Sequence, residues 1–243
     1  MRLTRVYLDA PLRAGGRVTL TGSAARHLTR VLRLRPGQPL TLFNGAGGEY
    51  AATIAALQGE KVLLAVAEAR AIERESPLTL TLAQGVSRGE RMDLVVQKAT
   101  ELGVSGIVPL LTERSVVRLR APQGRHKLEH WRAIAIAACE QSGRNRLPEI
   151  ASPVEFREFL REGAADSTRL LLSPQAGRRL ADIGKPTGRV TVLIGPEGGL
   201  KDEEQQAALS AGFEAVRLGP RVLRTETAAL AALTLLQQAF GDL

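Results

Sequence analysis

Hydrophobic and polar residues alternate along several short runs in the first 70 residues. Such alternation is typical of strands with one buried face, and turns rich in glycine separate the runs. One helical pattern interrupts them at residues 23–34, with Ser23 as its expected cap and a Pro-Gly pair at 36–37 as its expected end. Short strands around one helix predict a small β-barrel. The expected strands are residues 16–22, 38–57 (two strands around a turn) and 59–72.

A second pattern begins after the charged residues 70–76, where Pro77 opens it. From Leu78 onward, apolar runs of strand length alternate with longer runs of helical periodicity. This alternation favours a parallel sheet covered by helices, so the expected fold class is α/β. The predicted domains are 1–72, the barrel, and 73–243, the α/β domain. The expected strands are residues 78–86, 106–111, 168–174, 189–195 and 214–219, and the expected helices are 91–104, 126–144, 202–212 and 225–240.

Positive charge is concentrated near the start of the chain. The formal net charge is +8, and the first 40 residues contain eight arginines and one acid. Such a block favours a polyanion, above all nucleic acid and less an acidic membrane surface, although a basic surface can also serve solubility alone. With only eight aromatic residues, contact with phosphates is a better prediction than base stacking. The arginines expected around the short helix and its exit are Arg26, Arg30, Arg33 and Arg35.

Composition argues against several other classes of protein. Cys139 is the only cysteine, so no intramolecular disulfide can form, and the first residues lack the apolar core of a secretion signal. We therefore expect a reducing, cytoplasmic setting. No apolar run has membrane-spanning length, so no membrane partner is expected. The three histidines are scattered, so the sequence predicts no metal site.

Unusual loops follow three of the expected parallel strands. They read "LLLSP", "LIGPEGG" and "RLGPRVLRTETA", each with glycine or proline where an apolar strand ends. Ligands of open parallel sheets bind beyond the carboxyl ends of the strands, and bare backbone groups there suit a nucleoside. The alternative is that these loops are tight turns without a ligand.

The charges beside the glycine loop indicate which ligand fits. Glu197, Asp202, Glu203 and Glu204 surround a single Lys201, and such a cluster of acids repels a polyphosphate. Neither a Walker-type nor a dinucleotide glycine motif is present. A nucleoside that carries a cationic sulfonium fits better, and S-adenosylmethionine is such a molecule.

Long motifs resemble one enzyme family. The segments "IGPEGG", "LGPRVLRTETA", "QKATELGV", "TERSVV", "EQSGRNRLPEI" and "HLTRVLRLRPGQ" resemble the SPOUT-class, trefoil-knotted RNA methyltransferases, most closely the 16S rRNA (uracil-N3)-methyltransferase family. The resemblance covers nearly the whole chain. It implies a PUA-like β-barrel, a parallel-sheet SPOUT domain with a C-terminal trefoil knot, and a homodimer. One departure is Lys201, which stands where the family usually has a Ser or Thr helix cap.

The chemistry of methyl transfer to uracil indicates catalytic and RNA-binding candidates, and the resemblance implies the cofactor pocket. Arg224 is the first choice for stabilising negative charge on a uracil, and Glu226 is a second catalytic candidate that could instead serve only the closing helix. Gln141 and Arg144, at the end of a long helix, are candidates for RNA contact, although Gly143 beside them is an ordinary helix stop. The implied S-adenosylmethionine pocket consists of Leu172, Ser173, Ile194, Gly195, Glu197, Gly198, Gly199, Leu218, Gly219, Pro220, Val222, Leu223, Thr225 and Ala228.

Two further segments are candidates for the pocket that holds the base. Gln97, Lys98 and Glu101 share one helix, and Glu140 and Asn145 flank the end of another. Together, the motifs and the resemblance predict a methyltransferase that acts on N3 of a uridine in 16S rRNA of the small ribosomal subunit. Its rivals are a non-catalytic RNA-binding or ribosome-assembly factor and a nucleotide-binding enzyme. The third loop, at residues 217–228, favours the methyltransferase, because RNA binding alone needs no nucleoside pocket.

Overall fold

The chain folds into two compact units. The computed structural model describes all residues except 1–2, 116–120 and 162–166, so Val116 and Val117 of the "TERSVV" motif lie outside the described residues. The first unit comprises Met1–Glu75 and Cys139–Leu147, and the second comprises Ser76–Ala138 and Pro148–Leu243. Residues 139–147 thus belong to the first unit, although they follow the start of the predicted second domain. The boundary between residues 72 and 73 stays a prediction.

A five-stranded sheet forms the centre of the first unit. Its strand order is β1-β3-β4-β5-β2, and only the β1–β3 pair is parallel. Among the described residues β1 and β2 are free edges, so strand pairing does not close the expected barrel. Aliphatic side chains such as Leu42, Ile54 and Leu64 alternate inward and are almost wholly buried. The strands are β1 (Arg5–Tyr7), β2 (Arg17–Leu20), β3 (Pro39–Phe43), β4 (Glu49–Gln58) and β5 (Lys61–Arg70).

The helical interruption of this sheet differs in detail from its sequence pattern. It consists of α1 (Gly22–Arg26) and a π-helical turn, η1 (His27–Val31). The expectation that Ser23 caps the helix is wrong, because the N-cap is Thr21, whose side chain makes no capping hydrogen bond. Leu28 is fully buried and anchors the helix to the sheet. The exposed arginines of this segment therefore surround a fixed apolar anchor.

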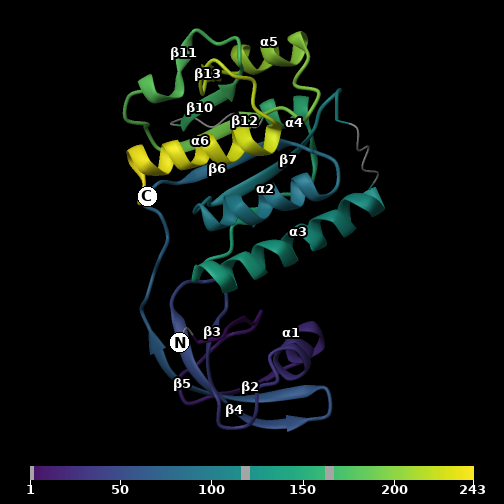
Figure 1. Ribbon diagram of the computed structural model, residues 1–243, viewed down its shortest axis with the longest axis vertical. Helices are drawn as coiled ribbons and strands as arrows, with labels where there is room; N and C mark the ends of the chain where they lie inside the picture. Colours follow the sequence, from purple (N-terminus) through teal and green to yellow (C-terminus); the bar gives the residue numbers. More distant parts are fainter. Residues whose placement is uncertain (1–2, 116–120, 162–166) are drawn as a thin grey trace. The chain divides into compact units, whose positions relative to one another are not determined.

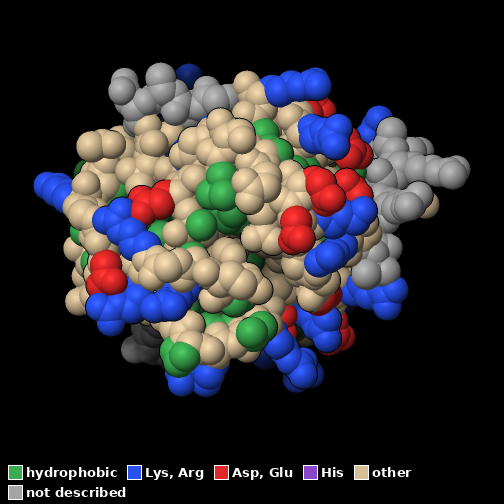
Figure 2. Space-filling view, turned by 90° about the horizontal axis from the view of Figure 1, so that it is seen from above, with side chains coloured by type: hydrophobic (Ala, Val, Ile, Leu, Met, Phe, Trp, Pro, Cys, Tyr) green, Lys and Arg blue, Asp and Glu red, His purple; other side chains and the backbone are tan. Residues whose placement is uncertain are grey.

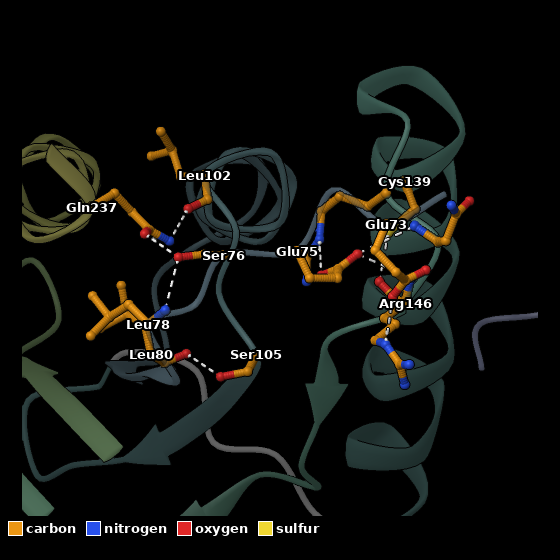
Figure 3. Close-up of polar contacts among 12 residues, drawn as sticks. Glu73, Glu75, Ser76, Leu78, Leu80, Leu102, Ser105, Cys139, Arg146 and Gln237 are labelled. Atoms are coloured by element: carbon orange, nitrogen blue, oxygen red, sulfur yellow. Dashed lines mark hydrogen bonds and ion pairs between the residues drawn. The ribbon is translucent and has the colours of Figure 1, made fainter. Parts of the chain in front are cut away.

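Buried charges tie the segment Cys139–Leu147 into the first unit. The Arg144 guanidinium is 5% exposed and donates to Glu75, whose other carboxylate oxygen accepts from the backbone amides of Asn145 and Arg146. Asn145 is fully buried and bonds to the Arg5 side chain. Burial raises the pKa of the Cys139 thiol to about 11, so this cysteine is held as an unreactive thiol. Figure 3 shows Glu73 and Glu75 beside Arg146.

A parallel sheet organises the second unit, as the sequence predicted. Its order is β11-β13-β10-β12-β6-β7-β8, and β9 pairs separately with β7. Figure 1 labels the strands from β11 to β7 of this order. Every recorded pairing in this sheet is parallel, which brings the carboxyl ends of neighbouring strands to one edge. The strands are β6 (Leu80–Gly85), β7 (Gly106–Leu111), β8 (Glu149–Ile150), β9 (Val154–Glu155), β10 (Ser167–Leu172), β11 (Arg178–Arg179), β12 (Arg189–Ile194) and β13 (Glu214–Arg217).

Helices pack around this sheet, and two of them pack on each other. The closing helix α6 contacts α2 and buries Ala229, Leu233 and Leu236. The fully buried Gln237 of α6 accepts from the Ser76 hydroxyl and donates to the Leu102 carbonyl (Figure 3). None of the described helices is long and apolar enough to cross a membrane. The helices are α2 (Glu90–Glu101), α3 (Ala121–Ser142), α4 (Phe156–Arg161), η2 (Leu180–Asp182), α5 (Asp202–Ser210) and α6 (Thr225–Phe240).

Candidate active site

Three loops at one edge of the parallel sheet surround a cavity of about 610 Å³. They follow three adjacent strands, β10, β12 and β13, whose parallel pairing places their ends side by side. We call them the first loop (residues 173–175), the second loop (195–201) and the third loop (218–224). The volume lies in the range of sites that enclose a small organic ligand.

The cavity brings together nearly all of the predicted cofactor and catalytic residues. Pro220 is the exception, since it is exposed and does not line the cavity. Val222 does line it but is 80% exposed, so its side chain stands at the opening. The predicted residues that line the cavity are Leu172, Ser173, Ile194, Gly195, Glu197, Gly198, Gly199, Leu218, Gly219, Val222, Leu223, Arg224, Thr225, Glu226 and Ala228.

Close contacts with neighbouring residues explain why some positions of the second loop are glycine. A Cβ on Gly195 would stand 2.9 Å from the backbone nitrogen of Leu200, and one on Gly198 would stand 3.2 Å from Arg114 Cβ. Gly199 has a φ of +68°, which favours glycine. A Cβ on Gly85, in β6, would lie 2.5 Å from Pro196. The loop is therefore held against its neighbours, and its bare backbone borders the cavity.

A buried polar latch joins the start of α6 to the second loop. The Thr225 hydroxyl donates to the Gly195 carbonyl at 2.7 Å, and the Gln84 side chain donates to that hydroxyl at 2.9 Å. Gln84 is fully buried in β6. Sequence reasoning missed this residue, although a glutamine in an apolar parallel strand is a signal of a polar partner. The latch sets the relative positions of two of the three loops.

Arg114 and Glu204 also hold the second loop. Arg114 had no predicted role, and Glu204 was predicted only as one of the acids that repel a polyphosphate. Arg114 Nη1 donates to the Gly198 carbonyl at 3.0 Å. The buried Glu204 carboxylate accepts from the backbone amides of Lys201 and Glu113, at 2.9 and 3.0 Å. Glu204 therefore accepts a hydrogen bond from the backbone amide of Lys201 at the start of α5. The Lys201 side chain cannot accept a hydrogen bond, and its ammonium pairs with Glu113.

A second ion pair lies beside the cavity. Glu197 Oε1 accepts from Arg91 Nη1 and from the Arg88 amide, both at 3.0 Å. Burial acts to raise the pKa of Glu197, but these hydrogen bonds outweigh it and the net pKa is lowered. The carboxylate therefore stays charged near neutral pH. Its contribution to stability is present above its unfolded-state pKa near 4.5 and is lost as the pH falls through the lower folded-state value.

Glu226 has a carboxylate oxygen without a partner. Its Oε1 lies 3.9 Å from Arg91 Nε, whereas its Oε2 is buried and accepts no hydrogen bond in the described structure. An acceptor buried without a donor costs about 1–3 kcal/mol. Arg224 precedes α6 as its N-cap, is exposed and also lines the cavity. The Glu226 carboxylate and the Arg224 guanidinium thus line the same cavity.

The candidates for RNA contact fall into two groups. Arg26, Arg30, Arg33 and Arg35 are all exposed in the first unit, as is Gln141. Arg144 is instead buried and pairs with Glu75, and the RNA contact expected from the sequence stays a prediction.

Glu140 and Asn145 likewise make internal bonds, to the Tyr7 amide and to the Arg5 side chain. These groups therefore organise the first unit from within. The prediction that they serve the base pocket has no support from their placement.

The helix α2 candidates do not reach the cavity. Lys98 and Glu101 form an ion pair with each other at 2.8 Å, Gln97 is exposed, and none of the three lines the cavity. His130 pairs with Asp93 at 2.8 Å. The described residues contain no cluster of three or more His, Cys, Asp or Glu that could hold a metal ion.

Comparison with known proteins identifies the family. Residues 74–237 match the RNA methyltransferase domain, and residues 20–67 match the RNA methyltransferase PUA domain. The ribosomal RNA small subunit methyltransferase E of Buchnera aphidicola subsp. Schizaphis graminum is 33% identical over 242 residues, which are 100% of this chain and 98% of the relative. The Synechocystis protein of the same name is 37% identical over 223 residues, which cover 89% of this chain and 71% of the relative.

Solved structures agree with this result. A Legionella pneumophila methyltransferase in complex with bound SAM superposes with a TM-score of 0.96 at 43% identity, over 100% of both chains. The Neisseria gonorrhoeae ribosomal RNA small subunit methyltransferase E, bound to S-adenosyl methionine, has a TM-score of 0.93 at 40% identity and 99% coverage of both chains. The resemblance read from the sequence motifs is thereby confirmed: the chain belongs to the RNA methyltransferase family, within the group of small-subunit ribosomal RNA methyltransferases E.

Proposed function

We propose that this protein transfers a methyl group from S-adenosylmethionine to N3 of one uridine in 16S rRNA of the small ribosomal subunit. The observation that carries the proposal is the cavity at the ends of β10, β12 and β13, where predicted cofactor residues and both catalytic candidates meet. The names of the relatives support the ribosomal RNA substrate, and the bound cofactor of two structural neighbours supports S-adenosylmethionine. The choice of N3 rests on the family that the motifs resemble.

The lining of the cavity fits this cofactor. Leu172, Ile194 and Leu218 offer apolar contacts, and the second loop offers backbone groups without side chains in the way. The carboxylates of Glu197 and Glu226 lie beside the space, which suits a ligand that carries a sulfonium and an ammonium. The residues present thus provide apolar contacts and two carboxylates for a cationic nucleoside, beside arginines that line the same cavity.

Arg224 and Glu226 divide the chemistry between them. S-adenosylmethionine supplies an electrophilic methyl group in an in-line displacement. Uracil N3 carries a proton at neutral pH, and the unpartnered Oε2 of Glu226 is the acceptor proposed for it. The Arg224 guanidinium donates to a carbonyl oxygen of the base and stabilises the negative charge left by that proton. These roles need no metal ligand and no further charged residue.

Filling the cavity from Gly219 is expected to weaken cofactor binding. Gly219 lines the cavity, and a Cβ there would meet no protein atom within 4 Å, so Gly219→Val fits the fold but takes space from the ligand. We expect calorimetry to show S-adenosylmethionine binding at least about tenfold weaker than in the wild type. Gly184→Val is the matched control, because Gly184 has equally open surroundings away from the cavity. Equal affinity in both variants would remove the cofactor from this site.

The exposed arginines of the first unit are proposed to bind RNA phosphates. Replacing Arg26, Arg30 and Arg35 with alanine is expected to flatten the salt dependence of rRNA binding by about one slope unit for each lost contact. Arg33 is left unchanged, because its backbone φ of +53° is unusual for a residue other than glycine. A substitution there would combine the loss of charge with a change in backbone strain. Filter binding over a series of salt concentrations measures the slope. A wild-type slope in the triple variant would place RNA on another surface.

The remaining parts of the proposal concern assembly. We propose a homodimer, a C-terminal trefoil knot and a cytoplasmic location, because the resembling family has these features and the substrate is ribosomal RNA. Leu94 on α2 and Leu235 on α6 are 39% and 41% exposed, which supports a partner surface on this helix pair. Sedimentation equilibrium of the purified chain tests the dimer directly.

A further inference from the structure

Three arginines without acidic partners line the cavity near the third loop. Arg217 ends β13, Arg221 lies within the loop and Arg224 precedes α6. In the described structure none of the three forms an ion pair. Three other arginines of the same unit are neutralised: Arg91 pairs with Glu197, Arg178 with Glu214, and Arg179 with Asp182.

This imbalance does not suit the cofactor. S-adenosylmethionine carries two positive groups and one carboxylate, so its net charge at neutral pH is positive, and uncompensated cations beside its pocket disfavour it. The same cations favour a polyanion that reaches the cavity. The visible face in Figure 2 has hydrophobic side chains near its middle, with Lys and Arg as well as Asp and Glu side chains around them.

We infer that Arg217 and Arg221 form a phosphate grip that holds the RNA backbone next to the target uridine at the mouth of the cavity. Arg217 is half-buried and Arg221 is exposed, so both approach the solvent from the cavity lining. Arg224 remains assigned to the base itself. The grip lies in the second unit and is separate from the arginines of the first unit. The inference rests on the proposed function, because it names a further contact of that enzyme with its RNA.

The grip has a thermodynamic consequence. When RNA phosphates neutralise the two arginines, their repulsion of the cationic cofactor disappears, so RNA and cofactor strengthen each other's binding. By linkage the factor is the same in both directions, and a change of about fivefold is typical of such coupling. RNA binding thus strengthens cofactor binding without any change in the conformation of the protein.

The test compares variants of the full-length chain with equal changes of charge. Arg217→Gln/Arg221→Gln removes the grip, and Lys185→Gln/Arg189→Gln is the matched control. Lys185 and Arg189 are both exposed and form no ion pair in the described structure. They lie at or before the start of β12, at the opposite end of the strand from the second loop. Arg217→Lys/Arg221→Lys keeps the charges and tests whether charge alone is required.

Two measurements decide the outcome. Filter binding of a 16S rRNA transcript over a salt series is expected to lose about two slope units in the Gln grip variant and none in the control or the Lys variant. Calorimetry is expected to show that this transcript tightens S-adenosylmethionine binding about fivefold in the wild type and not in the Gln grip variant. A wild-type slope in the Gln grip variant, or an equal loss in the control, overturns the grip. A wild type that binds no S-adenosylmethionine contradicts the proposed function instead.

Discussion

Glu226→Gln is expected to slow single-turnover methylation of 16S rRNA about a thousandfold, within the range for loss of a general base. The buried Oε2 of Glu226 has no partner, and the uracil N3 proton needs an acceptor before nitrogen attacks the methyl carbon. Glutamine keeps the shape of the side chain but loses the charge. Rapid-quench measurement of methyl transfer gives the rate. Raising the pH is expected to restore much of it, because the uracil then loses its proton to solvent.

A matched variant separates this role from a contribution to the helix. Glu226 lies in the first turn of α6, and Glu203 lies in the first turn of α5, where it is exposed. An acid at such a position contributes about 0.3–1 kcal/mol through the helix dipole. Both Gln variants are therefore expected to unfold slightly more easily, but only Glu226→Gln is expected to lose activity. A normal rate with Glu226→Gln would assign that residue to the helix alone.

Arg224→Lys is expected to slow the same step about a hundredfold, as for loss of one donor to a developing anion. Lysine keeps the charge but lacks the planar fork that can hold a carbonyl oxygen of the base. The affinity for S-adenosylmethionine is expected to change little, because the role is exerted on the base. Partial recovery at higher pH is also expected, since more of the uracil is then already an anion.

Arg189→Lys provides the control, because Arg189 is exposed and begins β12 away from the cavity. It is expected to methylate at the wild-type rate. If Arg224→Lys matches it, Arg224 anchors RNA or the loop, and another group stabilises the anion.

Periodicity predicted most of the fold. The apolar runs before Gly195 and Gly219 are strands of a parallel sheet, and residues 225–240 form α6 as predicted. Shorter elements were missed: the two- and three-residue strands, such as β8 and β11, carry too few residues for any period. The free edges of the five-stranded sheet were also missed, because alternation along a strand says nothing about which strands pair.

The candidate site was predictable where backbone dictates residue type. Glycine and proline at strand ends marked the three loops that line the cavity. The roles of polar residues were harder to predict, because the local sequence around a side chain such as Arg144 is the same whether it contacts RNA or Glu75. Gln84 bonds to Thr225, and Glu204 bonds to the Glu113 amide as well as to the nearby Lys201 amide. Thr225 and Glu113 lie far from their partners in the sequence, and no local spacing shows such contacts.

The most direct test of the central claim is methylation of unmodified 16S rRNA by the purified protein with isotopically labelled S-adenosylmethionine. Nuclease digestion and mass spectrometry then identify the labelled nucleoside. We expect label in a single uridine, on N3. At a subsaturating concentration of S-adenosylmethionine, transfer is expected to be strongly reduced in Glu226→Gln and Gly219→Val and unchanged in Gly184→Val. Cofactor binding without transfer to 16S rRNA, or label on a ribose oxygen or a base carbon, would contradict it.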